Sequence, residues 1–302
     1  MTRTEVHEPP HTVSSPVRLT ERLAALAMSC PVHPSIHLIE AAVSDWAHAA
    51  GLAPDPAASW LAGRAFARCE TRAVTLLARW LTWMSRLRAE PAALAPVLAV
   101  AAGGGPGTTP PARAFADLWE ACAPRMSDAW RERFTAGLST GARPVGEHAV
   151  GEHAVGEHAV GEHAVGEHAN AFGCLLLDLV EPCYGVEVPA PVRRSPQWQA
   201  LVEASGDVTT WCADAAAGRD GAAGAFLERS NRTATEEWVI DRVATRMEEL
   251  WTAARAIPAL TERHGLGFAA SHEVTRVACA FLTIPRAYLE WLLETPRYRH
   301  LG

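Results

Sequence analysis

The sequence predicts an all-α protein, a bundle of about ten helices joined by short loops. Almost no segment shows the apolar–polar alternation with a period of two that a half-buried strand requires. Apolar residues recur instead at helical spacing along most of the chain, and Gly- or Pro-rich stretches separate the helical segments. Bundles of this kind bury one shared core, and bundle cores are common places for a ligand cavity.

The helical pattern begins after a Pro-, Ser- and Thr-rich segment at 1–18, which we interpret as a flexible leader ahead of a helical domain at 19–302. Apolar residues at helical spacing predict a helix over 33–52, with Gly51 as its C-terminal stop. The stretch 58–90 is rich in Ala, Leu and Arg and contains no proline, so one or two helices are expected there.

The rest of the chain continues in the same way. We expect a loop at 101–112, a helical region at 111–138, a short apolar helix at 171–185 that stops near Pro182, an extended segment at 186–196, and helices at 195–218, 233–260 and 272–299, the last with a kink candidate at Pro285.

Composition excludes several classes of protein. A net charge of −7 gives no reason to expect a nucleic-acid partner, which selects basic faces. No apolar run approaches the length of a membrane span, and the N-terminal segment lacks the apolar core of a signal peptide, so a cytoplasmic protein is expected. The seven cysteines form no CxxC pair, which indicates thiols in a reducing compartment. The eleven tryptophans fit either core packing or an aromatic-lined cavity.

Five segments between residues 31 and 299 resemble, in the same order, those of bacterial class I terpene synthases. They are HPSIHLIEAAVSDWAHAAGL, ARWLTWMSRL, FADLWEACAPRMSDAWRERF, LVEPCYGVEVPAPVRRSPQWQAL and EWLLETPRY. The resemblance implies a single-domain antiparallel helical bundle around a central apolar cavity. In that family the cavity binds an isoprenyl diphosphate, Mg²⁺ ions draw off the diphosphate, and the carbocation cyclises against aromatic walls.

The chain departs from the family where the metal would bind. Aligned on the Trp-x-x-Trp run, the paired aspartates of the first metal motif fall on Arg88 and Ala89, with Glu90 as the nearest carboxylate. The Asn, Ser and Glu of the second motif fall on Ala213, Ala217 and Gly221, with Asp214 and Asp220 beside them. Glu90, Asp214 and Asp220 are the remaining candidate ligands. We interpret Asp214 and Asp220 as residues of a solvated helix face, and we expect no metal cofactor.

The phosphate-contacting positions are changed as well. Counted back from Glu181 and Gly185, the diphosphate-sensing arginine of the family falls on Glu167, and a carboxylate there would repel a diphosphate. The linker and effector positions fall on Asn170 and Ala171. Of the phosphate-contacting set only Arg297 and Tyr298 remain, and this pair also fits the exposed end of a C-terminal helix.

Glu167 belongs to five consecutive copies of Val-Gly-Glu-His-Ala at 145–169. Steps of five residues turn a helix by about 140°, so the histidines would not share one face. A glycine in each copy disfavours a helix by about 1 kcal/mol. We interpret the repeat as an exposed, flexible or partly helical segment; weak nickel or zinc binding is the alternative.

These observations leave hypotheses from three classes. The first is a cyclase of natural-product biosynthesis that closes rings, for example by a [4+2] addition, in a hydrophobic substrate without metal. Its cavity candidates are Trp83, Trp211 and Phe172, and Arg88 would anchor an acidic or carbonyl group. The second is a Mg²⁺-dependent cyclase of isoprenyl diphosphates with a divergent metal set. The third is a non-catalytic binding or partner protein. A homodimer is one assembly that the sequence allows.

Overall fold

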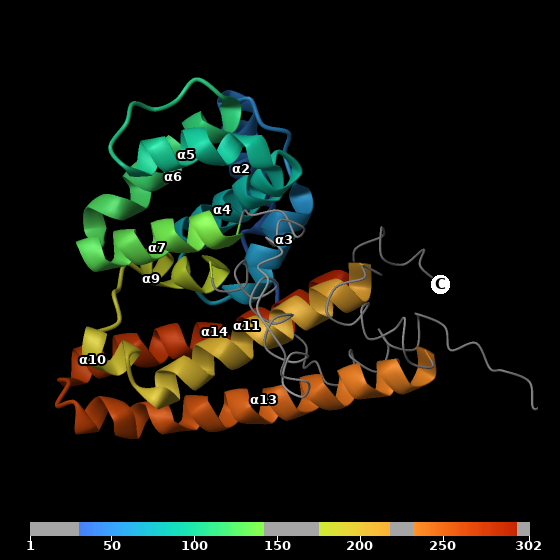
Figure 1. Ribbon diagram of the computed structural model, residues 1–302, viewed down its shortest axis with the longest axis vertical. Coiled ribbons are helices and arrows are strands. Elements are labelled where there is room, and N and C mark those ends of the chain that lie inside the picture. Colours follow the sequence, from blue (N-terminus) through green and yellow to red (C-terminus); the bar gives the residue numbers. More distant parts are fainter. Residues whose placement is uncertain (1–29, 142–174, 218–231, 295–302) are drawn as a thin grey trace, which may run out of the picture.

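The computed structural model describes residues 30–141, 175–217 and 232–294, and every regular element in these ranges is a helix (Figure 1). The predicted all-α class is therefore confirmed. The expected leader at 1–18 and the pentapeptide repeat at 145–169 lie outside the described residues. No helix in the described ranges is both long and apolar enough to cross a membrane.

The N-terminal helices form one layer of the molecule, at the top of Figure 1. They are α2 (Ile36–Ala50), α3 (Pro56–Ala65), α4 (Thr71–Ala89), α5 (Leu94–Ala101), α6 (Pro110–Cys122) and α7 (Asp128–Gly141), with short 3₁₀ turns at Pro91–Ala93 and Ala123–Arg125. Helix α4 lies at the centre of this layer, because α2, α3 and α6 all pack against it.

The C-terminal helices form the second layer, at the bottom of Figure 1, and the short α9 lies between the two layers. These helices are α9 (Val180–Tyr184), α10 (Ala190–Arg193), α11 (Pro196–Ala217), α13 (Arg232–Arg263) and α14 (Phe268–Glu294). Helices α11, α13 and α14 pack against one another, and α9 contacts both α4 above and α14 below. The layers are therefore joined through α9 and through a second contact between α3 and α14.

Local chemistry explains where the helices begin and end, with two differences from expectation, at Pro182 and at α10. Helix α2 ends at Gly51, as predicted, in the left-handed conformation (φ 77°). The 58–90 stretch divides into α3 and α4. The helix expected to stop near Pro182 continues to Tyr184, because Pro182 occupies the first turn of α9, where a missing N–H leaves no helical hydrogen bond unmade. The segment expected to be extended contains α10.

The second contact between the layers is a buried clamp. Arg64 on α3 donates to Glu290 on α14 at 2.7 Å and to the carbonyl of Cys30 at 3.0 Å. The N–H of Cys30 donates to the other oxygen of Glu290 at 2.6 Å. Because Arg64 is only 9% exposed, its charge depends on this carboxylate for compensation.

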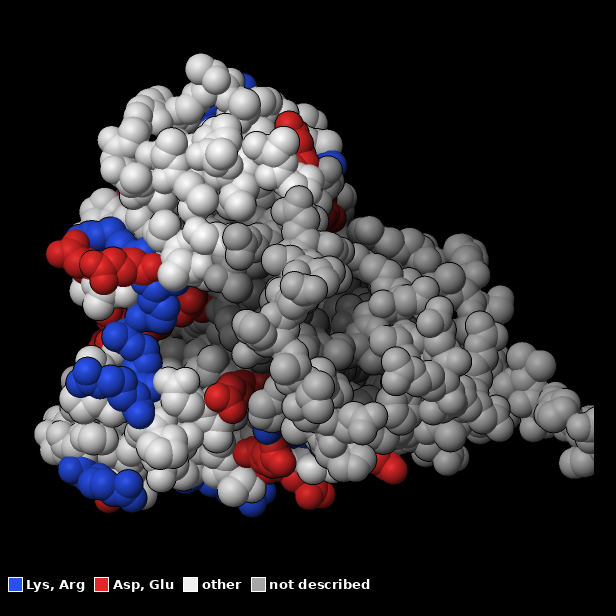
Figure 2. Space-filling model, in the orientation of Figure 1, with Lys and Arg blue, Asp and Glu red and all other residues white. Residues whose placement is uncertain are grey.

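Charged side chains are unevenly distributed over the surface. In the view of Figure 2 they gather beside α7 and α10 and along α13, whereas the upper part of the molecule is almost uncharged. The sequence accounts for this difference, since residues 91–112, which include α5, contain no charged side chain.

Candidate functional site

Aromatic side chains from α4, α6 and α7 form one packed cluster inside the upper layer. Its members are Trp80, Trp83, Phe115, Trp119, Trp130 and Phe134. Neighbouring ring centroids lie 5.0–5.9 Å apart in stacked, tilted and edge-to-face arrangements. Such aromatic pairs contribute about 0.5–1.5 kcal/mol each beyond the apolar area that they bury.

Trp83, the first of the cavity candidates, belongs to this cluster. Its side chain is fully buried, packs on Trp80 and Phe115, and donates its indole N–H to the carbonyl of Pro111 at 2.8 Å. These contacts account for Trp83 as a core residue that joins α4 to α6. Its place on a cavity wall stays a prediction.

The positions of the first metal motif lie at the C-terminal end of α4. The helix ends at Ala89, and the N–H of Glu90 closes its last turn on the carbonyls of Arg86 and Leu87. The Glu90 side chain is exposed. Arg88 lies in the last turn, and its side chain falls outside what the structure describes.

The positions of the second metal motif lie in the last two turns of α11. Trp211, Ala213, Asp214 and Ala217 all belong to this helix, and their side chains fall outside the described set. The remaining predicted positions lie in segments that the structure does not describe: Glu167, Asn170, Ala171, Phe172, Asp220, Gly221, Arg297 and Tyr298. Their roles stay predictions.

The chemistry of these helix ends does not fit the metal that the resemblance implies. Mg²⁺ takes hard oxygen ligands in near-octahedral geometry and is usually held through carboxylates. The end of α4 offers a cationic residue, an alanine and one exposed glutamate, and the end of α11 offers one aspartate between alanines. Within the described ranges, no three His, Cys, Asp or Glu side chains come together as a metal site requires.

A surface hollow beside α7 offers no better site for an apolar ligand. It is lined by Ala101, Asp128, Arg131, Glu132, Thr135, Ala136 and Ser139. Five of these seven residues carry charged or hydroxyl side chains, and the hollow opens to solvent, so it does not provide the enclosed apolar walls of a small-molecule site.

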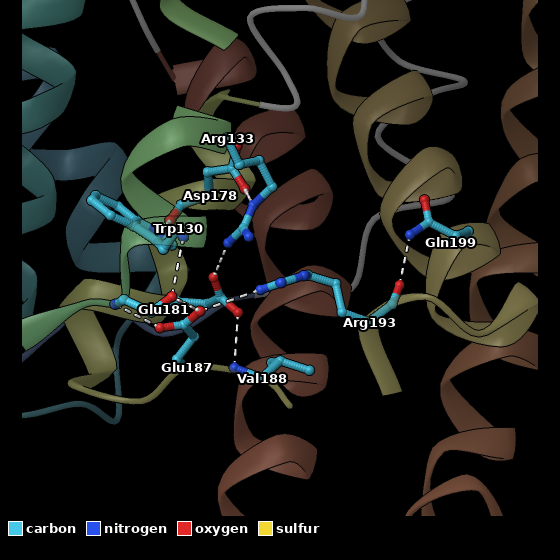
Figure 3. A network of polar contacts seen from close by, with 9 residues as sticks. Trp130, Arg133, Asp178, Glu181, Glu187, Val188, Arg193 and Gln199 are labelled. Carbon is cyan, nitrogen blue, oxygen red and sulfur yellow. Dashed lines mark hydrogen bonds and ion pairs between the residues drawn. The ribbon is translucent and has the colours of Figure 1, made fainter. Parts of the chain in front are cut away.

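A polar network between the layers is the feature that sequence reasoning missed (Figure 3). Arg133 on α7 donates to Asp178 at 2.8 Å and to Glu181 at 2.5 Å. Trp130, also on α7, donates its indole N–H to the carbonyl of Asp178 at 3.1 Å. The other oxygen of Glu181 accepts the backbone N–H of Val188 at 2.9 Å. These bonds fix the chain before and after α9 to the upper layer.

The network continues from the turn after α9 to the lower layer. Glu187 accepts the backbone N–H of Ser127 at 2.9 Å and its hydroxyl at 2.6 Å, and so holds the start of α7. Arg193 on α10 pairs with Glu187 at 3.5 Å, and its carbonyl accepts a bond from Gln199 on α11 at 2.6 Å.

The pKa values of these carboxyl groups are shifted in different directions, depending on whether burial or bonding dominates. Desolvation raises the pKa of Glu181 from 4.5 to about 7, although Arg133 and the Val188 N–H act to lower it. Desolvation likewise raises the pKa of Asp178 against the effect of Arg133. The more exposed Glu187 has a lowered pKa, because its bonds with Ser127 and Arg193 outweigh the smaller cost of its burial.

Glu181 and Gly185 were recognisable in the sequence only as landmarks of the family resemblance. Gly185 ends α9 in the left-handed conformation (φ 67°), which turns the chain so that Val188 reaches Glu181. The cue for a buried acid was present, since a glutamate stands in an otherwise apolar helix. Its partner, Arg133, lies 48 residues away, and local spacing cannot identify a partner at that distance.

Comparisons with known proteins agree on one family. The family model described as "Terpene synthase family 2, C-terminal metal binding" matches residues 77–253, more than half of the chain. The (−)-δ-cadinene synthase of Streptomyces clavuligerus is 28% identical over 261 residues, covering 75% of this chain and 76% of that protein.

Solved structures show the same fold at lower identity. Hedycaryol synthase in complex with nerolidol superposes with a TM-score of 0.73 and 17% identity, covering 87% of this chain and 97% of that one. Germacradien-4-ol synthase from Streptomyces citricolor gives a TM-score of 0.72 and 16% identity, covering 89% and 97%. The aromatic core, the two-layered helical fold and these matches together place the chain in the terpene synthase family.

Proposed function

We propose that this chain is a cyclase of the terpene synthase family that binds a hydrophobic, isoprenoid-like substrate and closes rings in it without Mg²⁺-assisted loss of diphosphate. One observation carries the proposal. At the end of α4, where the family resemblance places paired aspartates, the helix terminates in Arg88 and Ala89. A cationic residue there would repel Mg²⁺, and the matching turns of α11 offer only Asp214.

Ring closure in such a site would depend on shape rather than on ionisation. A rigid apolar pocket holds a flexible polyene in a folded conformer and removes an entropic part of the barrier on the order of several kcal/mol. A [4+2] addition suits this mode of catalysis, since it forms carbon–carbon bonds from π electrons already in the substrate and releases nothing. Arg88 would orient a substrate that carries a carboxylate or carbonyl group.

The solved relatives support the choice of probes. Hedycaryol synthase was solved in complex with nerolidol, an uncharged terpenoid alcohol. Linalool/nerolidol synthase from Streptomyces clavuligerus was solved in complex with 2-fluorogeranyl diphosphate. These two ligands separate binding of an apolar chain from binding of a diphosphate.

A Mg²⁺-dependent cyclase is the second candidate function. The family model and the cadinene synthase relative favour it. It requires Glu90, Asp214 and Asp220 to act as a divergent ligand set, although Glu90 is exposed at the end of α4. A protein that binds a terpenoid without transforming it is the remaining outcome.

The test compares ligands and metal dependence on the full-length protein. Binding of nerolidol and of 2-fluorogeranyl diphosphate is measured by tryptophan fluorescence, once with about 2 mM Mg²⁺ and once with excess EDTA. Release of pyrophosphate is measured with geranyl, farnesyl and geranylgeranyl diphosphate. We expect nerolidol binding that EDTA leaves unchanged and no release of pyrophosphate. Mg²⁺-dependent release of pyrophosphate that chelation abolishes would refute the proposal and establish the second candidate.

Arg88 provides a sharper control, because its replacement separates the two readings. In the Arg88→Ala variant, binding of a terpenoid carboxylic acid such as farnesoic acid should weaken by roughly tenfold, the effect of losing one charge-assisted hydrogen bond. Nerolidol binding should change little. Equal affinity of the variant and the wild type for the acid would remove Arg88 from the substrate site.

A further inference from the structure

Two adjoining sets of polar contacts lie between the two layers (Figure 3). One set runs from Arg133 on α7 through Glu181 to the Val188 backbone. The other runs from Ser127 through Glu187 to Arg193 on α10, and the two sets are joined by the backbone between residues 187 and 188. The cyclase proposed above needs both layers, since the predicted cavity positions lie on α4 in one and on α11 in the other. A contact that fixes the spacing of the layers would therefore also fix the pocket.

Glu181 is the residue that ties α9, and the turn after it, to α7. Its side chain is 4% exposed, and its two carboxylate oxygens serve different partners: one accepts from Arg133, the other from Val188. Asp178 and Arg193 are the other charged groups that act on it.

The faces of α9 that meet α4 and α14 carry a separate set of titratable groups. Cys69, just before α4, donates to the hydroxyl of Tyr184 at 3.2 Å, and Arg276 of α14 lies 4.9 Å from the centre of the Tyr184 ring. Cys183, on the same short helix, is buried, and its pKa is raised by burial beside Cys69 and Cys122. These groups contact Tyr184 and Cys183 rather than the Glu181 carboxyl.

We propose that Glu181 is a positioning residue for the substrate site. Only its ionised carboxylate, bonded at once to Arg133 and to the Val188 N–H, holds the turn that carries Glu187, and the Glu187–Arg193 pair then sets the spacing of the two layers that substrate binding requires. The effect on substrate binding rests on the proposed function, whereas the contacts of Glu181 do not depend on it.

The charge state of Glu181 matters because of the partners it has. Both partners are donors, so both oxygens must act as acceptors. Protonation turns one oxygen into a donor that faces a guanidinium or a backbone N–H, and one of the two bonds is lost. Burial raises the pKa of this carboxyl to about 7, which places the change near neutral pH. Substrate binding should therefore be strong above neutral pH and weaken below it.

The Glu181→Gln variant imitates the protonated state at every pH. Asp207→Asn is the matched control, since Asp207 is also a partly buried acid paired with an arginine, Arg246, but joins α11 to α13 within the lower layer. Two measurements are made on the full-length proteins between pH 6 and 8. One is the affinity for nerolidol. The other is amide hydrogen exchange of the peptide over 176–189, corrected for the intrinsic effect of pH on exchange.

In the wild type we expect roughly fivefold or greater weakening of nerolidol binding from pH 8 to pH 6, the range of typical coupling between sites. Loss of exchange protection over 176–189 should follow the same midpoint. Glu181→Gln should show the low-pH affinity and protection throughout, and Asp207→Asn should follow the wild type. Equal pH profiles in the wild type and Glu181→Gln would overturn the inference.

The two arms also separate this inference from the proposed function. If hydrogen-exchange protection over 176–189 changes with the protonation of Glu181 but nerolidol affinity does not, Glu181 has only a structural role. That result would refute its role in positioning the substrate site. Pyrophosphate release from diphosphate substrates would refute metal independence. In that case the pH dependence of turnover is measured in Glu181→Gln and Asp207→Asn instead of nerolidol binding, and it decides the role of Glu181. A protein that neither binds nor turns over any probe refutes the proposed function, and with it the positioning of a substrate site.

Discussion

The protonation of Glu181 should make the stability of this fold depend on pH in the direction opposite to that of an ordinary salt-bridged acid. Burial raises the pKa of the folded state from 4.5 to about 7. The folded protein therefore binds this proton more tightly than the unfolded chain does. The stabilising contribution is fully present below pH 4.5, and it is lost progressively as the pH rises through about 7.

The size of the effect follows from the two pKa values. A tenfold difference in proton affinity corresponds to about 1.4 kcal/mol. The rise from 4.5 to about 7 then gives a contribution of about 3 kcal/mol to the free energy of unfolding. Solvent screening does not reduce this figure greatly, because the side chain is 4% exposed.

Glu181→Gln removes this contribution, since an amide does not titrate. The free energy of unfolding is measured by urea denaturation at intervals from pH 5 to pH 8 for the wild type, Glu181→Gln and Asp207→Asn. We expect the difference between the wild type and Glu181→Gln to change by about 2–3 kcal/mol over this range in favour of the variant at high pH, because part of the full contribution is already lost at pH 5. In Asp207→Asn the free energy of unfolding should change with pH as it does in the wild type. Part of that change comes from Asp178, whose pKa is also raised by burial.

A pH-independent difference between the wild type and Glu181→Gln would refute this reasoning, because it would mean that the ion pair with Arg133 fully offsets the desolvation of the carboxylate. The predicted outcome carries a further consequence. Above neutral pH, Glu181→Gln would be at least as stable as the wild type and yet bind the substrate less well. A gain in stability combined with weaker substrate binding is expected for a charge that is kept for function, and not for a purely structural ion pair.

Three further substitutions test the packing described above, each by urea denaturation at neutral pH. Gly185→Ala should cost about 1–2 kcal/mol from its left-handed backbone alone, because a Cβ at this position meets no atom within 4 Å. Trp83→Phe leaves the carbonyl of Pro111 without its buried donor and should cost about 1–3 kcal/mol; no loss would mean that water replaces the indole. Glu290→Ala leaves the buried Arg64 without its compensating carboxylate and should cost about 3–5 kcal/mol, with Glu290→Gln intermediate.

Helix positions were predictable from the sequence wherever the deciding chemistry is local. Gly51 ends α2 because a left-handed residue closes the last turn, and the sequence indicates this directly. The continuation of α9 through Pro182 was not predicted, because the rule that proline stops a helix depends on knowing where the helix begins. The partner of Glu181 was not predictable either, since it comes from a different layer.

The structure bears on the question that the tryptophans raised, although the place of Trp83 on a cavity wall stays a prediction. Trp80, Trp83 and Trp130 are fully buried in the aromatic cluster, so the core-packing interpretation accounts for them. Composition and helical spacing could not distinguish this arrangement from a cavity wall, because both place an aromatic ring on the inner face of a helix. Whether a ring packs in the core or lines a cavity depends on which side chains face it from other helices, and local sequence spacing does not reveal those.

The segments that carry the family resemblance are largely the segments that hold the fold together. The Trp-x-x-Trp run supplies Trp80 and Trp83 to the core, and the stretch around Gly185 supplies Glu181 to the network between the layers. A likeness that rests on such residues is evidence for the fold and says little about the reaction. The positions that the family resemblance assigns to the reaction fall at the ends of α4 and α11, and both helices form although the residues there differ from the family pattern. Metal independence therefore stays a prediction, and chelation is the measurement that tests it directly.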